Sequence, residues 1–525
     1  MSKSTTTPIL QRVRSAQPWK PHKYQGSAVR FLIERAEAGL FLDPGLGKTS
    51  ITLGAIKILM GKKMVRRTLV LAPLRVAQTV WPEEVKKWKD FEGLRVVVLH
   101  GPDKDARLRE DADIYVMNYE GLDWLLGAER IVKKKWVTID GVRQQIDAPE
   151  TKYSLENFKK LGAEILVLDE STRVKHSSTQ KFKGLRQVLG KFHRRWILTG
   201  TPAPNGLLDL FGQCYCMDQG KALGQYITHY QSKYFMKVAG DQFNWYPQPG
   251  SQEKIYAALA PYVLRLDAKD YLELPELLEN DIFLDLPPRV RKFYDELELE
   301  FFAKTDAGEI FTAPSSGVAM MRCKQLANGA IYKRPIVNED DEAIPYDPRE
   351  WATFHDVKIE ALQELIESLQ GSPLLVAYEF KHDLFRLRKA LVKSAVCFDD
   401  FKTEKAVVDL VRRWNAGEIP VLLGHPASMS HGLNMQESSV NVAWFSQTHN
   451  REHYDQFNKR VLRQGNKNPR VTAHRFIMRH TVDEVAIAAL RRKDKVQTAL
   501  LDALKEYRAE KPRRKCWTKL GQFPR

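Results

Sequence analysis

The chain has 525 residues, 43% of them hydrophobic and 28% charged, a length that suggests about two to four domains. This composition provides apolar cores and a solvated surface, so it excludes a wholly disordered or collagen-like chain. The net charge of +17 favours a polyanionic partner, of which nucleic acid is the commonest.

The N-terminal segment 1–23 carries five basic residues and no acidic ones. It lacks an apolar stretch long enough for a signal peptide, and no part of the chain approaches the roughly 18 apolar residues that span a bilayer. We therefore expect a soluble protein without a membrane partner, which stays in the cell that makes it. Residues 1–20 are predicted to be a basic tail, either in contact with nucleic acid or simply solvated.

The stretch FLDPGLGKTS indicates a phosphate site, because an apolar strand leads through a Gly-containing turn into a helix. Gly45 and Gly47 allow backbone N–H groups to approach phosphate oxygens, which the helix N-terminus also favours. Lys48 would reach the β- and γ-phosphates, and the Thr49 hydroxyl would hold Mg²⁺. The strict P-loop pattern has glycine where this chain has Leu42, so a chance strand-turn-helix is the alternative.

Further apolar runs of strand length follow, separated by amphipathic segments such as 79–91. This alternation is typical of βαβ units and predicts a parallel sheet with helices on both faces. Segment 127–160 interrupts the pattern and predicts a hairpin around Asp140 and Gly141, whose basic flank either contacts nucleic acid or is only a surface loop. The predicted strands are 68–73, 95–100, 113–119, 164–170 and 194–202.

Two of these strands end in residues suited to nucleotide chemistry. Asp169 and Glu170 follow one strand at the edge where open α/β sheets bind ligands. Asp169 suits Mg²⁺ coordination, and Glu170 suits polarising the water that attacks a γ-phosphate. Alone, such a pair is commonly a helix N-cap, but after a P-loop it indicates ATP chemistry. Thr199 and Thr201 end the next strand and could couple the acidic pair to a moving element.

Residues 205–350 favour helices interrupted by Pro-rich breaks. The five cysteines of the chain are too few for a disulfide-dense scaffold, which indicates a reducing compartment. Cys214 and Cys216 have no second Cys/His pair at zinc spacing, and we expect ordinary buried thiols.

The second half repeats the strand-helix pattern and ends in residues 491–525, predicted to be a second basic tail with twelve basic and four acidic residues. We therefore predict an α/β fold of two tandem lobes with parallel sheets, at 21–260 and 261–490, joined by helical insertions. The predicted elements of the second half are helices at 356–370 and 405–417 and strands at 373–380, 419–426 and 440–446.

In this order, the segments resemble the SNF2-like ATPases of helicase superfamily 2, over most of the chain. The departures are Thr172 and Leu462, where the family usually has His, and Asn466, where it usually has Gln. The segments that carry the resemblance are PHKYQGSAVRFL, FLDPGLGKTS, LVLAPLRVAQTVWPEEVKKW, YVMNYEGL, DESTRVKH, LTGTPAPN, PYVLRLDAKDYLELPELLENDIFLDLPPRVRKFYDEL, MRCKQLANGAIY, HGLNMQ and QFNKRVLRQGNK.

The resemblance implies two RecA-like domains that bind ATP and Mg²⁺ at their interface, with Gln25 contacting adenine. It implies catalytic roles for Lys48, Asp169, Glu170, Arg460 and Arg463. It implies metal ligands at Thr49 and Asp169, and nucleotide contacts at Gln25, Gly45, Gly47, Lys48, Thr49, Ser50, Gly432 and Gln456.

Two arginines suit this chemistry, because planar cationic groups stabilise the charge that builds up on the γ-phosphoryl oxygens. Arg460 and Arg463 are three residues apart, so one helical face could present both. Without the other motifs, the same spacing would indicate only a solvated helix face.

The expected function is a DNA-dependent ATPase whose lobes close and open on ATP, and which moves along duplex DNA or remodels branched DNA. The family resemblance implies replication, recombination or repair as its setting. The compact chain resembles phage or bacterial members, so we expect a monomer in the cytoplasm of a bacterium or an infected host cell. A strand-separating DNA or RNA helicase and a non-motor nucleic-acid-binding protein are the alternatives.

Overall fold

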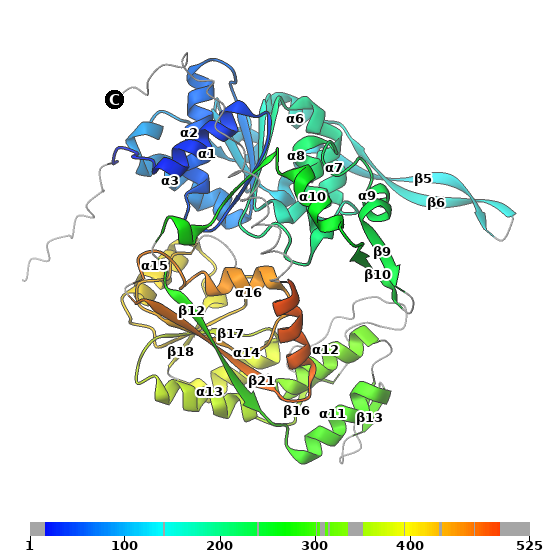
Figure 1. Cartoon of the computed structure of the whole chain (residues 1–525), viewed down its shortest axis with the longest axis vertical. Coiled ribbons are helices and arrows are strands. Elements are labelled where there is room, and N and C mark those ends of the chain that lie inside the picture. The colour runs from blue at the N-terminus through cyan, green and yellow to red at the C-terminus, as the bar shows by residue number, and fades with distance from the viewer. Residues whose placement is uncertain are drawn as a thin grey trace, which may run out of the picture.

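The computed structural model describes residues 16–493, apart from 140–141, 239–240, 273, 301, 305–309, 313–315, 334–349, 393, 430–432 and 467. The chain forms two α/β lobes stacked one above the other, each built on a parallel sheet (Figure 1). The predicted fold class is therefore confirmed. The predicted tails lie largely outside the described residues.

Lobe 1 contains a seven-stranded sheet in the order β11-β1-β8-β7-β2-β4-β3, in which every strand pair is parallel. All the strands predicted from the apolar runs are present, one or two residues shorter at most ends. The strands are β1 (Glu37–Leu42), β2 (Thr68–Ala72), β3 (Val96–Val98), β4 (Ile114–Asn118), β7 (Ile165–Asp169), β8 (Arg194–Thr199) and β11 (Val263–Leu266).

Helices cover both faces of this sheet, because successive strand residues point to opposite sides. Leu69 and Leu71 of β2 belong to one apolar core, whereas Val70 and Ala72 belong to the other. The helices are α1 (Lys23–Glu34), α2 (Lys48–Gly61), the π-helical segment η1 (Val76–Val80), α3 (Trp81–Lys87), α4 (Lys104–Arg107), α5 (Leu122–Leu126), α6 (Glu156–Leu161), α7 (Gln180–Val188), α8 (Leu210–Asp218), α9 (Ile227–Tyr234) and α10 (Ser251–Leu259).

Lobe 2 contains a six-stranded sheet in the order β12-β21-β20-β17-β19-β18, again with parallel pairs. The strands of this sheet are β12 (Glu276–Leu284), β17 (Leu374–Ala377), β18 (Ala395–Cys397), β19 (Val421–Gly424), β20 (Asn441–Trp444) and β21 (Arg470–Met478). Its helices are α11 (Pro288–Glu300), α12 (Ser316–Ala327), α13 (Val357–Ser368), α14 (Lys381–Leu391), α15 (Glu404–Asn415) and α16 (Arg451–Asn458).

The segment between the two lobes differs in detail from the sequence expectation. The sheet of lobe 1 extends past residue 260 to take up β11, and the chain changes sheets between β11 and β12. Residues 205–350 hold helices α8 to α12, but also short antiparallel ladders that the sequence analysis did not foresee. These ladders pair β9 (Phe235–Val238) with β10 (Asp241–Pro247), β13 (Phe302–Lys304) with β14 (Ile310–Thr312), and β15 (Ala330–Tyr332) with β16 (Trp351–Thr353).

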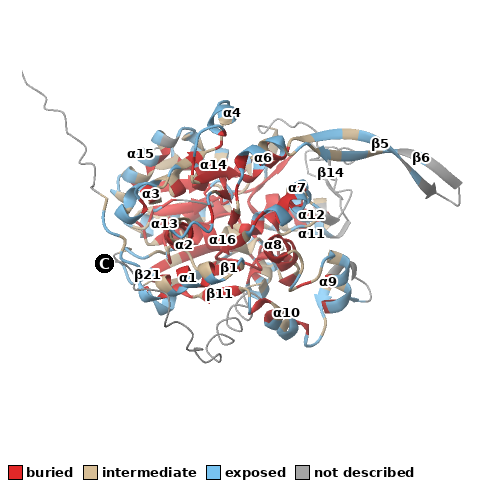
Figure 2. Ribbon diagram, turned by 90° about the horizontal axis from the view of Figure 1, so that it is seen from above, coloured by how far each residue is buried: buried red, intermediate tan, exposed pale blue. Residues whose placement is uncertain are grey.

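The predicted hairpin of lobe 1 is confirmed and occupies most of segment 127–160. Its strands β5 (Ala128–Ile139) and β6 (Val142–Tyr153) pair as far as Ile139 and Val142, while the turn at 140–141 lies outside the described residues. The hairpin projects from the body of the protein and is largely exposed where its side chains are described (Figure 2).

The cysteine pair of α8 also agrees with expectation. Cys214 and Cys216 are fully buried in the core, and burial raises the pKa of both thiols. In the described part of the chain, no helix combines the length and apolar character needed to cross a membrane.

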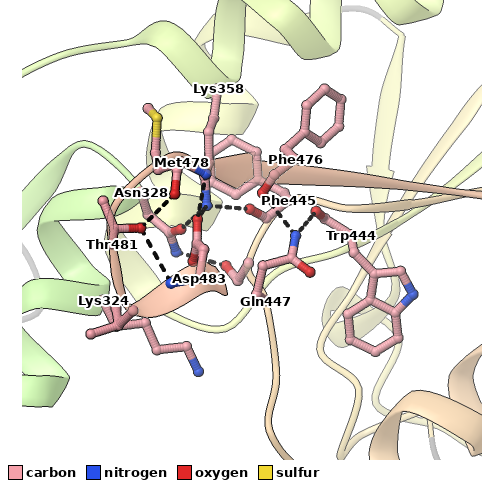
Figure 3. Close-up of polar contacts among 12 residues, drawn as sticks. Lys324, Asn328, Lys358, Trp444, Phe445, Gln447, Phe476, Met478, Thr481 and Asp483 are labelled. Atoms are coloured by element: carbon pink, nitrogen blue, oxygen red, sulfur yellow. Dashed lines mark hydrogen bonds and ion pairs between the residues drawn. The ribbon is translucent and has the colours of Figure 1, made fainter. Parts of the chain in front are cut away.

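A buried polar network closes the carboxyl ends of β20 and β21 in the lobe 2 sheet (Figure 3). Its centre is Lys358, whose side chain is fully buried and whose Nζ lies 2.7 Å from Asp483 Oδ2. Nζ also donates to Asn328 Oδ1 at 2.9 Å and to the carbonyl of Phe445 at 3.1 Å. Asn328 in turn donates to Ser446 Oγ at 2.8 Å. These bonds tie α12 and α13 to the ends of β20 and β21.

Candidate functional site

The predicted phosphate loop lies between β1 and α2, with a backbone shape that requires glycine. Gly45 and Gly47 have φ angles of 91° and 80°, a region that side chains rarely adopt. A Cβ on Gly47 would lie 2.6 Å from Gln25 Nε2. The loop thus leads directly into the N-terminus of α2, where Lys48 is the first helical residue and Nζ donates to the carbonyl of Leu42 at 2.9 Å.

Gln25 of α1 lies against this loop rather than in open solvent. Its Oε1 accepts a hydrogen bond from the backbone N–H of His22 at 3.0 Å, and its Nε2 donates to the carbonyl of Leu46 at 3.2 Å. The structure therefore brings Gln25 to the phosphate loop, and contact with adenine stays a prediction. Ser50 is engaged locally, since its hydroxyl donates to the Gly47 carbonyl at 3.0 Å.

Asp169 ends β7 at the carboxyl edge of the lobe 1 sheet and is held from two sides. The indole Nε1 of Trp81 donates to Asp169 Oδ2 at 3.0 Å, and the Tyr119 hydroxyl donates to the Asp169 carbonyl at 2.9 Å. Glu170 follows with a φ of 53°, in the left-handed region that non-glycine residues seldom occupy. Such backbone strain concentrates at functional positions, where surrounding contacts maintain it.

The charged side chains of Lys48, Asp169 and Glu170 at the carboxyl edge of the lobe 1 sheet shift one another's pKa values. Burial raises the pKa of Glu170 to about 7, opposed by the nearby Lys48 cation and reinforced by Asp169. Burial likewise raises the pKa of Asp169 and lowers that of Lys48, whose charge the two carboxylates stabilise. A carboxylate with a pKa near neutrality suits a general base, and an ammonium group beside it suits phosphate binding.

Arg460 and Arg463 come from lobe 2 and converge on one carbonyl. Both donate through Nη1 to the backbone oxygen of Leu433, at 3.1 and 3.0 Å. Arg460 Nε also donates to the carbonyl of Gln456 at 2.8 Å. Burial lowers the pKa of both guanidinium groups, while the charge of Glu170 across the interface opposes this for Arg460.

The expected helical face for these arginines is not present. Helix α16 ends at Asn458, and the following residues form turns around Gly465, whose φ is 92°. Arg460 and Arg463 therefore lie on turns after the helix, and the shared acceptor, not helical spacing, brings them together. Gly432 lies outside the described residues.

Further contacts join the lobes beside the site, around Glu452 of α16. Thr172 Oγ1 donates to Glu452 Oε1 at 3.0 Å, and Gln456 Nε2 donates to the same oxygen at 3.2 Å. Lys175 Nζ lies 3.9 Å from Glu452 Oε2 and 3.3 Å from Asp209 Oδ2. Thr172, which replaces the usual histidine of the family, thus has a partner in the opposite lobe.

The turn after β8 is linked to the acidic segment by buried hydrogen bonds, and a coupling role of the Thr199 and Thr201 hydroxyls stays a prediction. The Thr199 hydroxyl accepts a bond from the backbone N–H of Thr201 at 3.1 Å. The link to the acidic segment runs through the fully buried Gln213, which accepts from Ser171 Oγ at 2.8 Å and donates to the Pro202 carbonyl at 2.5 Å. Gln213 belongs to α8 and carries no sequence signal of its own.

The residues at this edge fit a magnesium nucleotide by their chemistry. Thr49 and Asp169 offer a hydroxyl and a carboxylate, the hard oxygen ligands that Mg²⁺ takes when water and phosphates complete its shell. No cluster of three or more His, Cys, Asp or Glu residues suited to a metal occurs among the residues that the structure describes.

The chain is similar to one known protein family and to several known proteins. A model of the SNF2-related domain matches residues 24–342. Protein p41 of Acyrthosiphon pisum secondary endosymbiont phage 1 is 32% identical over 92% of this chain and 98% of its own length. The CHD3-type chromatin-remodeling factor PICKLE of Arabidopsis thaliana is 23% identical over 92% of this chain, which spans only 34% of PICKLE.

Among solved structures, the SWI2/SNF2 ATPase core of Sulfolobus solfataricus in complex with double-stranded DNA is similar to this chain. The two share 20% identity over 94% of this chain and 97% of the other, with a TM-score of 0.39.

Proposed function

The chain belongs to the family of proteins with an SNF2-related domain, and from this premise we propose that it is a DNA-dependent ATPase that moves along or remodels DNA. Replication, recombination or repair in a bacterial or phage-infected cytoplasm is the proposed setting, in keeping with its similarity to a phage protein. Proteins of this family use ATP. In this chain we assign ATP hydrolysis to residues at the interface of the two lobes, and we take DNA to be the polymer that stimulates it.

One observation carries the proposal: the groups suited to ATP chemistry come from both lobes and meet at their interface. Lys48, Asp169 and Glu170 lie on lobe 1, while Arg460 lies close enough on lobe 2 for its charge to act on Glu170. Because neither lobe holds the complete set, catalysis requires the lobes to be closed, and their opening can be coupled to movement.

Each residue then has a chemical role. The backbone N–H groups at the start of α2 and the Lys48 ammonium bind the phosphates. Thr49 and Asp169 would hold a bound Mg²⁺, which would neutralise part of the phosphate charge. Glu170 accepts a proton from the attacking water, which its pKa of about 7 permits at neutral pH. Arg460 and Arg463 stabilise the negative charge that develops on the γ-phosphoryl oxygens.

A groove between the lobes supports nucleic acid as the second ligand. It has a volume of about 620 Å³ and is lined by lobe 1 residues that follow β2 and β7 and by residues of lobe 2, including Arg75, Arg173 and Lys402. The guanidinium of Arg75 stacks on Phe398 of lobe 2, 4.9 Å from the ring centroid, while its buried Nη1 has no hydrogen-bond partner among the residues that the structure describes. Such cationic groups suit phosphate contacts that carry no sequence specificity.

The projecting hairpin β5–β6 makes strand separation the second candidate function. A helicase needs an element that divides the strands, and β5–β6 exposes Trp136 and Val132, which retain 54% and 71% of their accessible surface. Aromatic side chains on a protruding element can stack on unpaired bases. Removing residues 130–151 should abolish strand displacement if the hairpin divides the strands, and should leave DNA-stimulated ATP hydrolysis intact.

The test is steady-state ATP hydrolysis without nucleic acid and with single-stranded, duplex and forked DNA and RNA. Strong stimulation by duplex or forked DNA is expected, and triplex displacement then measures movement. Stimulation by single strands or RNA alone would instead favour the strand-separating helicase. Absence of hydrolysis under every condition would contradict the proposal and favour a non-motor binding protein.

A further inference from the structure

The bond between Trp81 and Asp169 joins two sites that the sequence separates. Trp81 is fully buried at the start of α3, and its only polar atom, Nε1, donates to Asp169 Oδ2 at 3.0 Å. A buried hydrogen bond to a carboxylate is stronger than one between neutral groups, and it fixes which way the carboxylate faces. The orientation of the Asp169 carboxylate is thereby tied to the start of α3.

The helical segment that carries Trp81 has an unusual geometry. The five residues before it form the π-helical segment η1 (Val76–Val80), and α3 begins directly at Trp81. π-helical turns are rare and occur frequently at functional sites, because the wider turn shifts the following side chains relative to an α-helix. Here the shift concerns the first residue of α3, the one that bonds to Asp169.

The opposite side of the same segment faces the groove between the lobes. Arg75, Gln78 and Thr79 line this groove, whereas Val76 and Ala77 are buried in the core of lobe 1. The Thr79 hydroxyl also donates to the Arg75 carbonyl at 2.9 Å, which ties the groove residues into the segment itself. One short segment therefore presents one side to the groove and the other to Asp169.

We propose that Trp81 is a positioning residue through which nucleic acid in the interlobe groove sets the orientation of Asp169 and thereby accelerates ATP hydrolysis. This inference rests on the proposed function, in which Asp169 holds Mg²⁺ and the groove receives a phosphate backbone. A phosphate that binds Arg75 pulls on η1, and the indole at the end of η1 transmits the displacement to the carboxylate. Trp81 itself touches neither nucleotide nor nucleic acid.

The test replaces Trp81 by phenylalanine, which keeps a buried ring and removes the N–H donor. The matched control is Trp196→Phe. Trp196 is also fully buried in lobe 1, and its Nε1 donates to the carbonyl of Arg35 at 3.2 Å, away from the acidic pair. Both variants lose one buried indole and its hydrogen bond, so a purely structural effect lowers the melting temperature of each and leaves the Mg²⁺ dependence of both alike.

Two measurements on the full-length protein decide the role. The first is Mg²⁺ titration of fluorescent ADP binding, which involves no turnover. Trp81→Phe is expected to need about 10- to 100-fold more Mg²⁺ at half-saturation, the usual effect of losing a partner of a metal ligand. The second is ATP hydrolysis at saturating Mg²⁺, where duplex DNA is expected to accelerate Trp81→Phe far less than Trp196→Phe.

An unchanged Mg²⁺ requirement in Trp81→Phe overturns the positioning role, and unchanged stimulation by DNA overturns the coupling. Failure of the proposed function has a different signature, since the wild-type protein would then show no stimulation by any nucleic acid. The coupling between nucleic acid and Asp169 would then be refuted as well. The Mg²⁺ dependence of ADP binding would still decide whether Trp81 positions Asp169.

Discussion

The two lobes use the carboxyl edge of the same kind of sheet in opposite ways. In lobe 1 this edge presents Lys48, Asp169 and Glu170, whose charges are only partly compensated. In lobe 2 the carboxyl ends of β20 and β21 are instead sealed by the ion pair of Lys358 with Asp483 and by the hydrogen bonds around it. A parallel sheet thus offers a ligand site, but local side chains decide whether the site stays open.

The difference assigns distinct tasks to the lobes. Lobe 1 carries the phosphate loop and the acidic pair, whereas lobe 2 contributes Arg460 and Arg463 from turns beside its sheet. Substitutions in lobe 1 should therefore remove nucleotide binding, those at the arginines should remove hydrolysis, and those in the sealed network should remove stability.

The largest effect is expected from Lys48→Ala. Loss of the ammonium beside the phosphate loop should reduce ATP hydrolysis below detection, because the phosphates lose their main cationic partner. Steady-state hydrolysis with duplex DNA measures this, with Lys57→Ala on the same helix as the control. Turnover at the wild-type rate would show that the phosphate loop is wrongly assigned.

Arg463→Ala should separate binding from hydrolysis. Arginines that stabilise the transferring phosphoryl group are worth about 10³–10⁵ in rate, so hydrolysis should fall by at least about 10³ while ATP still binds. Single-turnover hydrolysis and fluorescent nucleotide binding measure the two steps, and Arg470→Ala on β21 is the control. Loss of ATP binding in a folded Arg463→Ala protein would refute the role of this arginine.

Lys358→Met tests the sealed edge of lobe 2. The change leaves Asp483 as a buried charge without its cation, which typically costs about 3–5 kcal/mol of stability. Denaturant unfolding should show a larger loss in Lys358→Met than in Lys48→Ala, because Glu170 beside Lys48 already has a pKa of about 7 and can take up a proton. Equal stability of the two variants would contradict the claim that the Lys358 network stabilises lobe 2 more than Lys48 stabilises lobe 1.

Glu170→Gln should change the pH dependence of stability. The pKa of Glu170 in the folded protein is about 7, above its ordinary value of 4.5, so the fold favours the protonated form. Stability contributed by this group is present below pH 4.5 and is lost as the pH rises through 7. The nucleotide-free Glu170→Gln variant should therefore melt increasingly above the wild type from pH 5 to pH 8. A constant difference across this window would contradict the raised pKa.

Glu452→Gln should give the smallest effect. It removes the charge opposite Lys175 but keeps an acceptor for Thr172, a loss of about 1 kcal/mol or roughly fivefold in rate. ATP hydrolysis at limiting duplex DNA measures this, and the exposed Glu437→Gln is the matched control. Identical rates in both variants would show that the contact does not hold the lobes together.

The sequence predicted those parts of the molecule that depend on local pattern. Strand-length apolar runs gave the central strands of both sheets, and the glycines of the phosphate loop follow from backbone geometry at Gly45 and Gly47. The hairpin was predicted from a two-residue turn signal at Asp140 and Gly141.

Contacts between distant segments could not be predicted in this way. Trp81 lies 88 residues from Asp169, and Thr172 lies 280 residues from Glu452, so only the folded chain reveals these bonds. Trp81 was noted as part of a motif, but periodicity could only mark it as a core residue. The position of Arg460 and Arg463 on turns after α16 depends likewise on the tertiary acceptor at Leu433.

The most direct test of the central claim is the distance between the lobes during the ATP cycle. Donor and acceptor dyes at the exposed positions Lys62 of lobe 1 and Glu367 of lobe 2, introduced as Lys62→Cys and Glu367→Cys in a Cys516→Ser background, would report it by single-molecule energy transfer. With duplex DNA and a non-hydrolysable ATP analogue, we predict one closed population that opens when ADP replaces the analogue. The same distribution in every nucleotide state would contradict a site completed by lobe closure.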